Sequence, residues 1–366
     1  MSDAAAPDPE DLEHLGLYDP AAPDAAERLE LIRYVLAAGA SVDDVACTTN
    51  LGELALDRTL RVRGERTMAE VAAECGLEWD VALRLLRAAG LVPDPSQPAT
   101  AGEADAIRLL ATARREYLGE EATIQLARVT GHAMARVAET LVGVFRLRME
   151  VPRRDAGTRY VDVVKEYAEL ARTLLPVFVG TLDAALRRQI VAVAERMWWV
   201  DEDRSAVMLP RTVGFVDLVG YTASTSRLTV RELTRVLVDF DTRTADVVAA
   251  GNGQIVKTIG DEAMFVTEDP VDACRIALDL VDAAGDALAP VRVGLAVGEM
   301  VSVLGDIYGP DVNLAARLVA EARPASALVS ADVRTAAQHG GFRFEAVAPL
   351  QLKGYPGPVT AFRLGR

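Results

Sequence analysis

Residues 252–266 of this 366-residue chain read Asn-Gly-Gln-Ile-Val-Lys-Thr-Ile-Gly-Asp-Glu-Ala-Met-Phe-Val. The pair Asn252-Gly253 favours a tight hairpin-type turn, and the residues from Gln254 onward predict a strand. Gly260-Asp261 indicates a second turn, and the apolar run from Ala263 predicts another strand. The segment therefore predicts two consecutive strands, and the turn between them carries a carboxylate.

The flanking sequence alternates between strand and helix patterns. Further strands are expected at 212–219, within 291–303 and around Gly354 and Gly357 within 342–364, and helices at 230–250, 269–284 and 311–322. The order strand-helix-strand-strand-helix-strand, with additions, predicts an α+β domain with a ferredoxin-like βαββαβ sheet and helices packed on it. We assign this domain to residues 210–366.

The N-terminal half follows a different pattern. Residues 26–198 keep apolar positions mostly at three- and four-residue spacing, which predicts an all-α domain of about eight to ten helices. Residues 1–25 are rich in Ala, Pro and Asp and are expected to form a flexible acidic tail. Residues 199–209 are expected to be a linker between the two domains.

The composition excludes several classes of protein. Lys and Arg total 39 against 54 Asp and Glu, and a net charge of −15 argues against a general polyanion binder. Three scattered cysteines favour a reducing compartment over a disulfide framework or a zinc site. The N-terminus has no signal-peptide pattern, and charged residues interrupt the apolar stretch 174–191. We therefore expect a cytoplasmic protein that is not an integral membrane protein.

Two carboxylates follow apolar strands. Asp217 lies in Phe-Val-Asp-Leu-Val-Gly-Tyr-Thr, and Asp261 lies in the turn described above. Taken singly, Asp217 could cap the next helix and Asp261 could satisfy backbone N–H groups of its turn. Together they suit Mg²⁺, a hard ion that binds one or two protein oxygens and keeps its other positions for water and phosphate. Two such ions can stabilise the attacking and leaving oxygens of a phosphoryl displacement.

Two more clusters carry groups suited to a nucleotide. In Gly-Asp-Ile-Tyr-Gly-Pro-Asp-Val-Asn-Leu-Ala-Ala-Arg, residues 305–317, Asn313 and Arg317 lie one helical turn apart and can present an amide and a guanidinium together. Lys353 places a cation at a turn rich in Gly and Pro. The simpler interpretations are a first-turn asparagine with a surface arginine, and an ordinary loop lysine.

Residues 210–366 closely resemble the class III nucleotidyl cyclase catalytic domain. The matching blocks, in the family's order, are FVDLVGYT (215–222), VKTIGDEAMF (256–265), GDIYGPDVNLAARL (305–318) and LKGYPGPV (352–359). The resemblance implies an adenylyl cyclase that converts ATP to 3′,5′-cyclic AMP and pyrophosphate. The 3′-oxygen of ATP would attack its own α-phosphorus, with catalysis mainly by positioning and electrostatics.

The resemblance also implies a role for each matched residue. Asp217 and Asp261 match aspartates that bind two Mg²⁺ or Mn²⁺ ions, and Lys257 and Asp306 match the pair that reads the purine. Asn313 matches the asparagine that positions the ribose, and Arg317 matches the arginine that stabilises charge on the α-phosphate. Lys353 matches a lysine that contacts the terminal phosphates. Some relatives have an additional phosphate-binding arginine where this chain reads Gly-Glu-Met around Glu299. Either Lys353 and another arginine suffice, or the triphosphate binds more weakly.

Hydrogen-bond polarity favours adenine over guanine at Lys257 and Asp306. Adenine offers an acceptor at N1 and a donor at N6, whereas lysine donates and aspartate accepts. Guanine has the reverse polarity, for which guanylyl cyclases tend to use a glutamate at the lysine position. The alternatives are a guanylyl cyclase, or a nucleotide-binding or DNA-linked regulator with weak or no activity. The complete set of matched residues argues against loss of activity.

The resemblance implies an active site at a dimer interface. In the family, one subunit supplies the metal-binding aspartates and the other supplies the groups for base, ribose and phosphate. This chain carries both sets, so we expect a head-to-tail homodimer with two equivalent sites and an inactive monomer.

Residues 67–91 resemble a helix-turn-helix with Gly76 at the turn. The second helix, at about 78–90, has no net charge and no basic face, so DNA is not an expected partner. The whole chain resembles actinobacterial soluble cyclases with an N-terminal all-α regulatory domain, in which some relatives respond to pH or to a fatty acid.

Two features of this domain bear on such signals. His132 is the one histidine within its predicted helices, although a lone helical histidine is more often simply packed. An apolar helical segment could line a lipid pocket, although core packing is the simpler interpretation; its residues are Leu174, Leu175, Val177 and Phe178.

Overall fold

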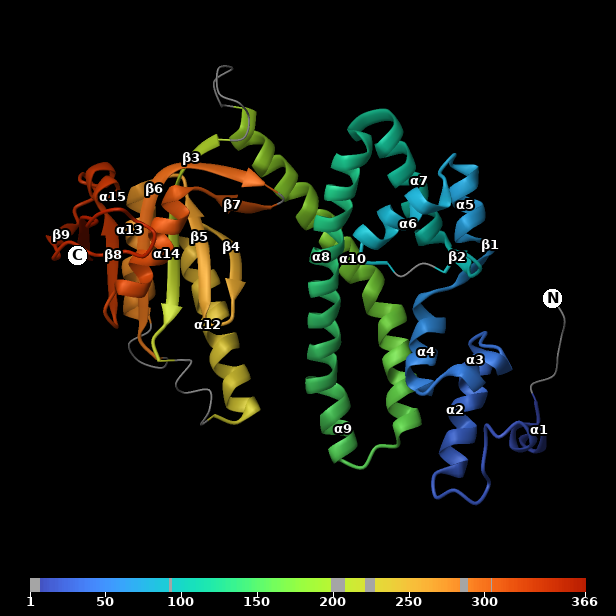
Figure 1. The fold of residues 1–366 in the computed structure, drawn as a ribbon. Helices are drawn as coiled ribbons and strands as arrows, with labels where there is room; N and C mark the ends of the chain where they lie inside the picture. The colour runs from blue at the N-terminus through green and yellow to red at the C-terminus, as the bar shows by residue number, and fades with distance from the viewer. Residues whose placement is uncertain (1–6, 92–93, 199–207, 221–227, 284–288, 304) are drawn as a thin grey trace. The chain divides into compact units, whose positions relative to one another are not determined.

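The computed structural model describes residues 7–91, 94–198, 208–220, 228–283, 289–303 and 305–366. The chain divides into two compact units, Met1–Glu195 and Arg196–Arg366 (Figure 1). Of the expected linker 199–209, residues 199–207 lie outside the described residues. Met208 and Leu209 already belong to the first strand of the second unit.

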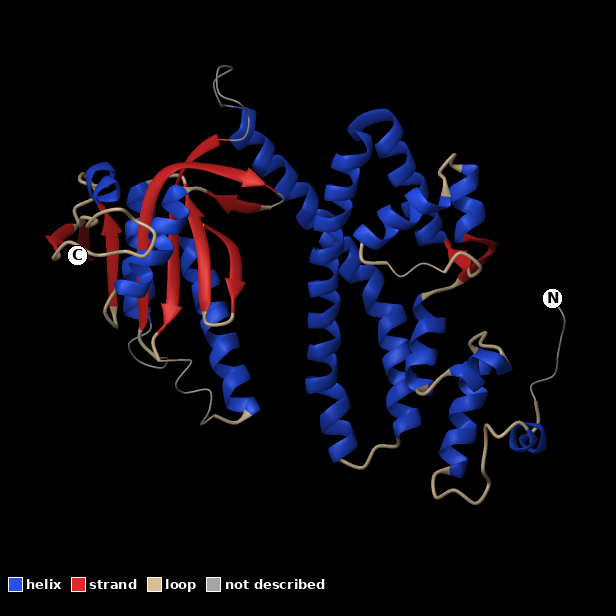
Figure 2. Cartoon of the chain, viewed as in Figure 1, coloured by secondary structure: helices blue, strands red, loops and turns tan. Residues whose placement is uncertain are grey.

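The N-terminal unit is built mainly from helices, as the sequence predicts (Figure 2). The helices are α1 (Pro9–His14), α2 (Ala25–Ala37), α3 (Val42–Cys47), α4 (Leu51–Leu60), α5 (Met68–Glu74), α6 (Trp79–Ala88), α7 (Ala101–Thr112), α8 (Gly119–Phe145), α9 (Val151–Asp155) and α10 (Tyr160–Trp198). Two π-helical segments follow α7 and α8, namely η1 (Ala113–Leu118) and η2 (Arg146–Glu150). Capping boxes at Ser41, Thr67 and Thr100 fix where α3, α5 and α7 begin.

Two features of this unit correct the sequence-based expectation. Within the expected tail 1–25, α1 forms because the Asp8 side chain accepts from the Asp11 N–H, and Leu12 and Leu17 are buried in a core with α2 and α4. A two-stranded antiparallel sheet also interrupts the helices; it pairs β1 (Arg63–Thr67) with β2 (Pro98–Thr100). Neither strand shows apolar alternation, which is why the pattern did not predict them.

Helices α5 and α6 form the predicted helix-turn-helix. Gly76 has φ of +70° in the turn, a conformation that glycine adopts without steric cost. The apolar faces of α5, α6 and α7 pack into a core of their own, which includes Val71, Leu86 and Ile107. Arg84, one of the few cations on α6, pairs with Glu120 at 2.6 Å. This geometry fits a small packed subdomain and adds nothing in favour of DNA binding.

The C-terminal unit is a sheet covered by helices on both faces. Its strands within the described residues are β3 (Met208–Leu218), β4 (Gln254–Ile259), β5 (Glu262–Thr267), β6 (Val291–Val303), β7 (Asp306–Tyr308), β8 (Ser326–Ser330), β9 (Arg343–Ala346) and β10 (Ala361–Gly365), and its helices are α12 (Val230–Ala250), α13 (Pro270–Ala283), α14 (Pro310–Glu321) and α15 (Ala331–Ala336). The strand order is β4-β5-β3-β6-β8-β10-β9, with β7 paired to β6. The order β4-β5-β3-β6, antiparallel throughout, confirms the predicted ferredoxin-like core.

Alternation along the strands decides which helix covers which face. On β3, Val216 and Leu218 pack in the core that also contains residues of α12, α13 and α15. Val213 and Phe215 pack in the core that contains Ala315 and Val319 of α14. Because side chains alternate along a strand, residue 217 lies on the α14 face of the sheet.

Helix α14 approaches β6 most closely at Gly294. A Cβ atom there would lie 2.3 Å from the backbone nitrogen of Val319 and 2.4 Å from the carbonyl oxygen of Ala315. Gly294→Ala is therefore expected to destabilise the C-terminal unit by about 1–3 kcal/mol, because α14 must shift away from the sheet.

Chemical denaturation monitored by circular dichroism measures this loss. Gly180→Ala is the matched control, because a Cβ atom at Gly180 in α10 meets no atom within 4 Å. That control is expected to be neutral or slightly stabilising. Equal stability of Gly294→Ala and the wild type would contradict the close packing.

Candidate active site

Asp217 and Asp261 lie at the same end of adjacent strands. Asp217 is on β3, directly opposite Glu262 at the start of β5, and Asp261 occupies the turn that precedes Glu262. The Leu218 N–H donates to the Asp261 carbonyl oxygen at 3.1 Å, which fixes the turn against β3. The structure thus brings together the two carboxylates that the sequence predicted as metal ligands.

The acidic groups at this end of the sheet perturb one another. Asp217 is only 9% exposed. Burial raises the pKa of Asp261, and the charge of Asp217 raises it further. Burial also raises the pKa of Glu262, with Asp217 and Asp261 adding to the effect. A partly buried excess of negative charge on hard oxygen donors is an environment that a divalent cation would relieve.

A cation here would depend on two protein carboxylates. Within the described part of the chain, no group of three or more His, Cys, Asp or Glu side chains is arranged to hold a metal ion. Mg²⁺ and Mn²⁺ accept such sparse sites, because water and phosphate oxygens complete their coordination. The donor set therefore fits a metal site that is completed by a nucleotide.

Lys257 and Asp306 are brought together from positions 49 residues apart. Lys257 is on β4 and Asp306 begins β7, and the Lys257 Nζ lies 2.5 Å from the Asp306 Oδ2. The Ile307 N–H donates to the Asp306 Oδ1 at 2.8 Å. Burial raises the pKa of Asp306, but the hydrogen bonds from Lys257 and Ile307 outweigh it, so the pKa is lowered. A cationic donor and an anionic acceptor therefore stand side by side.

This ion pair predicts a dependence of stability on pH. The folded state holds the pKa of Asp306 below its usual 3.8, so the stabilisation is present above that value and is lost as the pH falls through the folded pKa. Asp306→Asn is expected to lower the free energy of unfolding at pH 5 to 7, by an amount that shrinks below about pH 4. Denaturant titrations of both proteins across this range measure the difference. A gap that widened on acidification would contradict the assignment.

Asn313 and Arg317 are exposed on α14, one turn apart. The loop that carries Lys353 docks against the start of this helix, because the Tyr355 hydroxyl donates to the Pro310 carbonyl oxygen at 3.2 Å. Burial raises the pKa of Tyr355, and the charge of Arg317 opposes that rise. The exposed Lys353 thus belongs to a loop held against the helix of Asn313 and Arg317, so the phosphate and ribose candidates form a second group.

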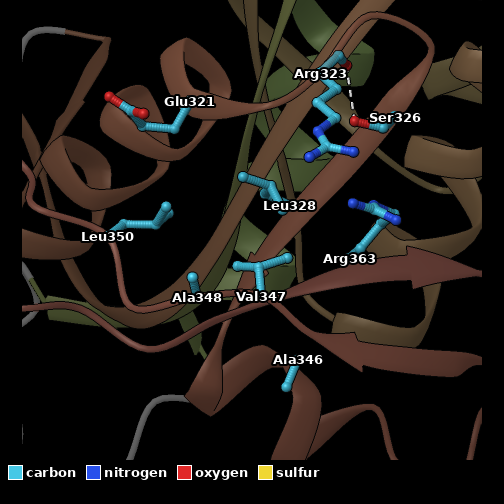
Figure 3. A pocket seen from close by; sticks show the side chains of 9 residues that line it. All are labelled: Glu321, Arg323, Ser326, Leu328, Ala346, Val347, Ala348, Leu350 and Arg363. Atoms are coloured by element: carbon cyan, nitrogen blue, oxygen red, sulfur yellow. Dashed lines mark hydrogen bonds between the residues drawn. The ribbon is translucent and has the colours of Figure 1, made fainter.

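A single chain does not join these two groups. Among the described residues, no hydrogen bond or ion pair connects either metal-site aspartate with Asn313, Arg317 or Lys353. A cavity of about 320 Å³ in this unit lies elsewhere (Figure 3); it is lined by Glu321, Arg323, Ser326, Leu328, Ala346, Val347, Ala348, Leu350 and Arg363. None of the seven predicted site residues lines it. The candidate active site is therefore open and divided within one chain.

Sequence reasoning missed Arg292 and Glu262. Arg292 lies on β6 directly opposite Asp217, and its Nε and Nη2 both lie 2.6 Å from the Asp217 Oδ2. One signal was available, namely a single arginine in the otherwise apolar first part of the strand, residues 291–298. Its partner was not readable from sequence, because the partner depends on the register between two distant strands.

Position 299, where some relatives carry a phosphate-binding arginine, holds an exposed glutamate. The nearest cation in the sheet register is Arg211 on β3, which lies opposite Gly298. Its guanidinium pairs with Glu268 at 3.2 Å. Arg211 is thus the arginine that the fold places beside this position.

The regulatory candidates of the N-terminal unit are exposed or only partly buried. His132 lies on the exposed surface of α8. On α10, Leu174 is 57% exposed and Val177 is 69% exposed, which corrects the interpretation that they pack in a core. Neither of the two described cavities is lined by this segment. Among the described residues, none of the helices has the length and apolar character of a membrane span.

Both halves of the chain match known families. Residues 208–365 match the adenylate and guanylate cyclase catalytic domain, and residues 9–192 match the adenylate cyclase regulatory domain. The chain is 36% identical over 317 residues to an uncharacterised protein of Mycobacterium tuberculosis H37Rv, a match that covers 81% of this chain and 79% of that protein. It is 36% identical over 268 residues to an adenylate cyclase of Streptomyces coelicolor, covering 72% and 69%.

A more distant relative spans more of the chain. It is a pH-sensitive adenylate cyclase of Mycobacterium tuberculosis, 28% identical over 357 residues, covering 93% of this chain and 88% of that protein. Among solved structures, the catalytic core of a rhodopsin-guanylyl cyclase with converted specificity is 22% identical, with a TM-score of 0.40 over 43% of this chain and 95% of that chain. The chain belongs to the class III adenylate cyclase family, with the family's regulatory domain before its catalytic domain.

Proposed function

We propose that this protein converts ATP to 3′,5′-cyclic AMP and pyrophosphate. The observation that carries the proposal is the pairing of Lys257 on β4 with Asp306 on β7 at 2.5 Å. The lysine can donate to N1 of adenine while the aspartate accepts from N6, so the pair matches the Watson–Crick edge of adenine and opposes that of guanine. ATP is therefore the proposed substrate, and GTP the disfavoured one.

Asp217 and Asp261 would hold two Mg²⁺ or Mn²⁺ ions, which would neutralise phosphate charge and favour ionisation of the 3′-hydroxyl. The support is their position at one end of adjacent strands and the raised pKa of Asp261, whose burial beside Asp217 disfavours two bare negative charges. Both aspartates present oxygen donors of the kind that these ions prefer. The two ions would also hold the triphosphate in a position that lets the base reach Lys257 and Asp306.

The remaining residues would position and stabilise the reacting groups. Asn313 would orient the ribose so that the 3′-oxygen faces the α-phosphorus, and Arg317 would bind oxygens of the α-phosphate as negative charge develops. Lys353 would bind the terminal phosphates. A bond then forms between the 3′-oxygen and the α-phosphorus, the bond to the bridging oxygen breaks, and the electron pair leaves with pyrophosphate. The 3′-hydroxyl proton passes to solvent.

The same proposal includes a head-to-tail homodimer. Among the described residues of one chain, no direct hydrogen bond or ion pair joins the metal carboxylates to the ribose and phosphate residues, and Asn313, Arg317 and Lys353 are exposed. A second copy can bring its exposed group against the metal site of the first, and the same operation completes a second site. On this proposal the isolated chain lacks a complete active site.

The test uses the purified full-length protein with ATP or GTP and Mn²⁺, and products are separated by chromatography. We expect cyclic AMP, with much less cyclic GMP from GTP. Faster formation of cyclic GMP would identify a guanylyl cyclase. Absence of both products from a folded dimer would contradict the proposal and favour an inactive nucleotide-binding regulator.

We also propose that the N-terminal unit regulates the reaction. The support is the match of residues 9–192 to the adenylate cyclase regulatory domain. A pH signal or a lipid ligand stays a prediction, which activity profiles of the full-length protein against pH and with added fatty acid would test.

A further inference from the structure

Arg292 connects the metal carboxylate to the helix of the ribose and phosphate group. Its Nε and Nη2 each lie 2.6 Å from the Oδ2 of Asp217. Its Nη1 donates to the carbonyl oxygen of Ala320 at 2.8 Å, in the last turn of α14. One guanidinium therefore joins β3, β6 and α14.

The arrangement is specific to a planar guanidinium. Charge-assisted hydrogen bonds are short and directional, and two of them on one oxygen limit rotation of the carboxylate. Both fall on the Oδ2 of Asp217, so the Oδ1 is left for a cation. A lysine ammonium at position 292 would supply the charge but could not reach Asp217 and Ala320 with the same fixed geometry.

Burial makes the orientation of Asp217 matter. The side chain of Asp217 is 12% exposed and that of Arg292 is 32% exposed, so water screens their interaction only partly. Asp261 and Glu262 place further negative charge beside Asp217. Without Arg292, Asp217 would lose its one ion-pair partner among the described residues and could turn away from the orientation that a metal requires.

We propose that Arg292 is a positioning residue of the metal site, which holds Asp217 in the metal-binding orientation and ties it to α14. This inference rests on the proposed function. It goes beyond that function by naming a residue that touches neither substrate nor metal. In the proposed homodimer, Asp217 serves one active site while Asn313 and Arg317 of the same chain serve the other, so Arg292 also links the two sites.

Binding of Mn²⁺ without nucleotide tests the proposal directly. Mn²⁺ affinity of the full-length protein is measured by electron paramagnetic resonance for the wild type, Arg292→Gln and Arg292→Lys. Loss of an outer-shell partner typically costs 10–100-fold in metal affinity or activity. We expect Arg292→Gln to weaken Mn²⁺ binding by roughly 10-fold or more and to lower kcat at saturating metal with a smaller change in KM for ATP. Arg292→Lys should recover only part of either loss.

Arg275→Gln is the matched control. Arg275 pairs with Asp272 at 2.6 Å on α13 and is 51% exposed, so its loss should leave Mn²⁺ binding unchanged. Unchanged or tighter Mn²⁺ binding by Arg292→Gln would overturn the proposal. Tighter binding would mean that the positive charge of Arg292 competes with the metal ion for Asp217. If Arg292→Gln does not fold, the test rests on Arg292→Lys. Mn²⁺ binding by Arg292→Lys with the same affinity as the wild type would then overturn the proposal. Weakened binding without any cyclase activity in the wild type would refute the proposed function alone.

Discussion

Asp261→Asn is expected to lower cyclic AMP production by roughly 10²–10³-fold, the scale of losing one electrostatic contact to a developing charge. The amide removes a negative charge from the pair at the end of β3 and β5 while keeping the shape of the side chain. Arg317→Ala, on the exposed face of α14, is expected to be similarly inactive because charge on the α-phosphate is no longer balanced.

Mixing these two inactive variants should restore activity. In a head-to-tail heterodimer one site receives both substitutions and the other receives neither. An equal mixture that exchanges subunits freely is therefore expected to reach about a quarter of wild-type activity by statistical pairing. The assay is cyclic AMP formation after co-expression or after subunit exchange.

A mixture of Asp261→Asn with Asp217→Asn is the control. Both substitutions fall in the same half of the site, so every dimer keeps two damaged metal halves and must stay inactive. Recovery in this control, or no recovery with Arg317→Ala in confirmed heterodimers, would contradict the proposed assembly.

Lys257→Arg is expected to lose most of its activity with ATP, by about 10²-fold in kcat/KM, although the positive charge is kept. The lysine on β4 lies 2.5 Å from Asp306 on β7, and both side chains are only partly exposed. A slim ammonium can approach one ring nitrogen, whereas a guanidinium fork would crowd the purine edge and prefer to pair bidentately with Asp306.

Lys353→Arg provides the comparison for this variant. Lys353 is exposed, and an arginine there can still bind phosphate oxygens, so a loss of only a few-fold is expected. The kinetic constants for ATP and GTP are measured for both variants. Near-normal turnover of Lys257→Arg would show that the sparing use of lysine, three in all against 36 arginines, reflects composition alone. The third lysine, Lys165, pairs with Glu30 at 2.5 Å and is partly exposed, which agrees with a structural role.

Strand and helix boundaries of the C-terminal unit followed closely from local pattern. The predicted helix 230–250 is the observed α12, and the strand pair that flanks Asp261 is the observed β4 and β5. The short elements β7, β8 and α15 were not predicted. Each strand has five residues or fewer and the helix has one or two turns, so the apolar residues show too little periodicity to indicate an element. In the N-terminal unit, α1 was missed because its composition resembles a tail while two leucines supply the packing.

The sequence by itself determined the class of fold, the family, and which side chains carry the chemistry, because apolar period, turn residues and motif spacing are local properties. Only the tertiary structure decided which of those side chains meet. Sheet register places Asp217 beside Asp261 and Arg292 beside Asp217, and the approach of β7 to β4 places Lys257 beside Asp306. Both arrangements depend on the packing of strands far apart in the chain. The same packing leaves Asn313, Arg317 and Lys353 apart from the metal carboxylates, which is why the second copy of the chain enters the proposal.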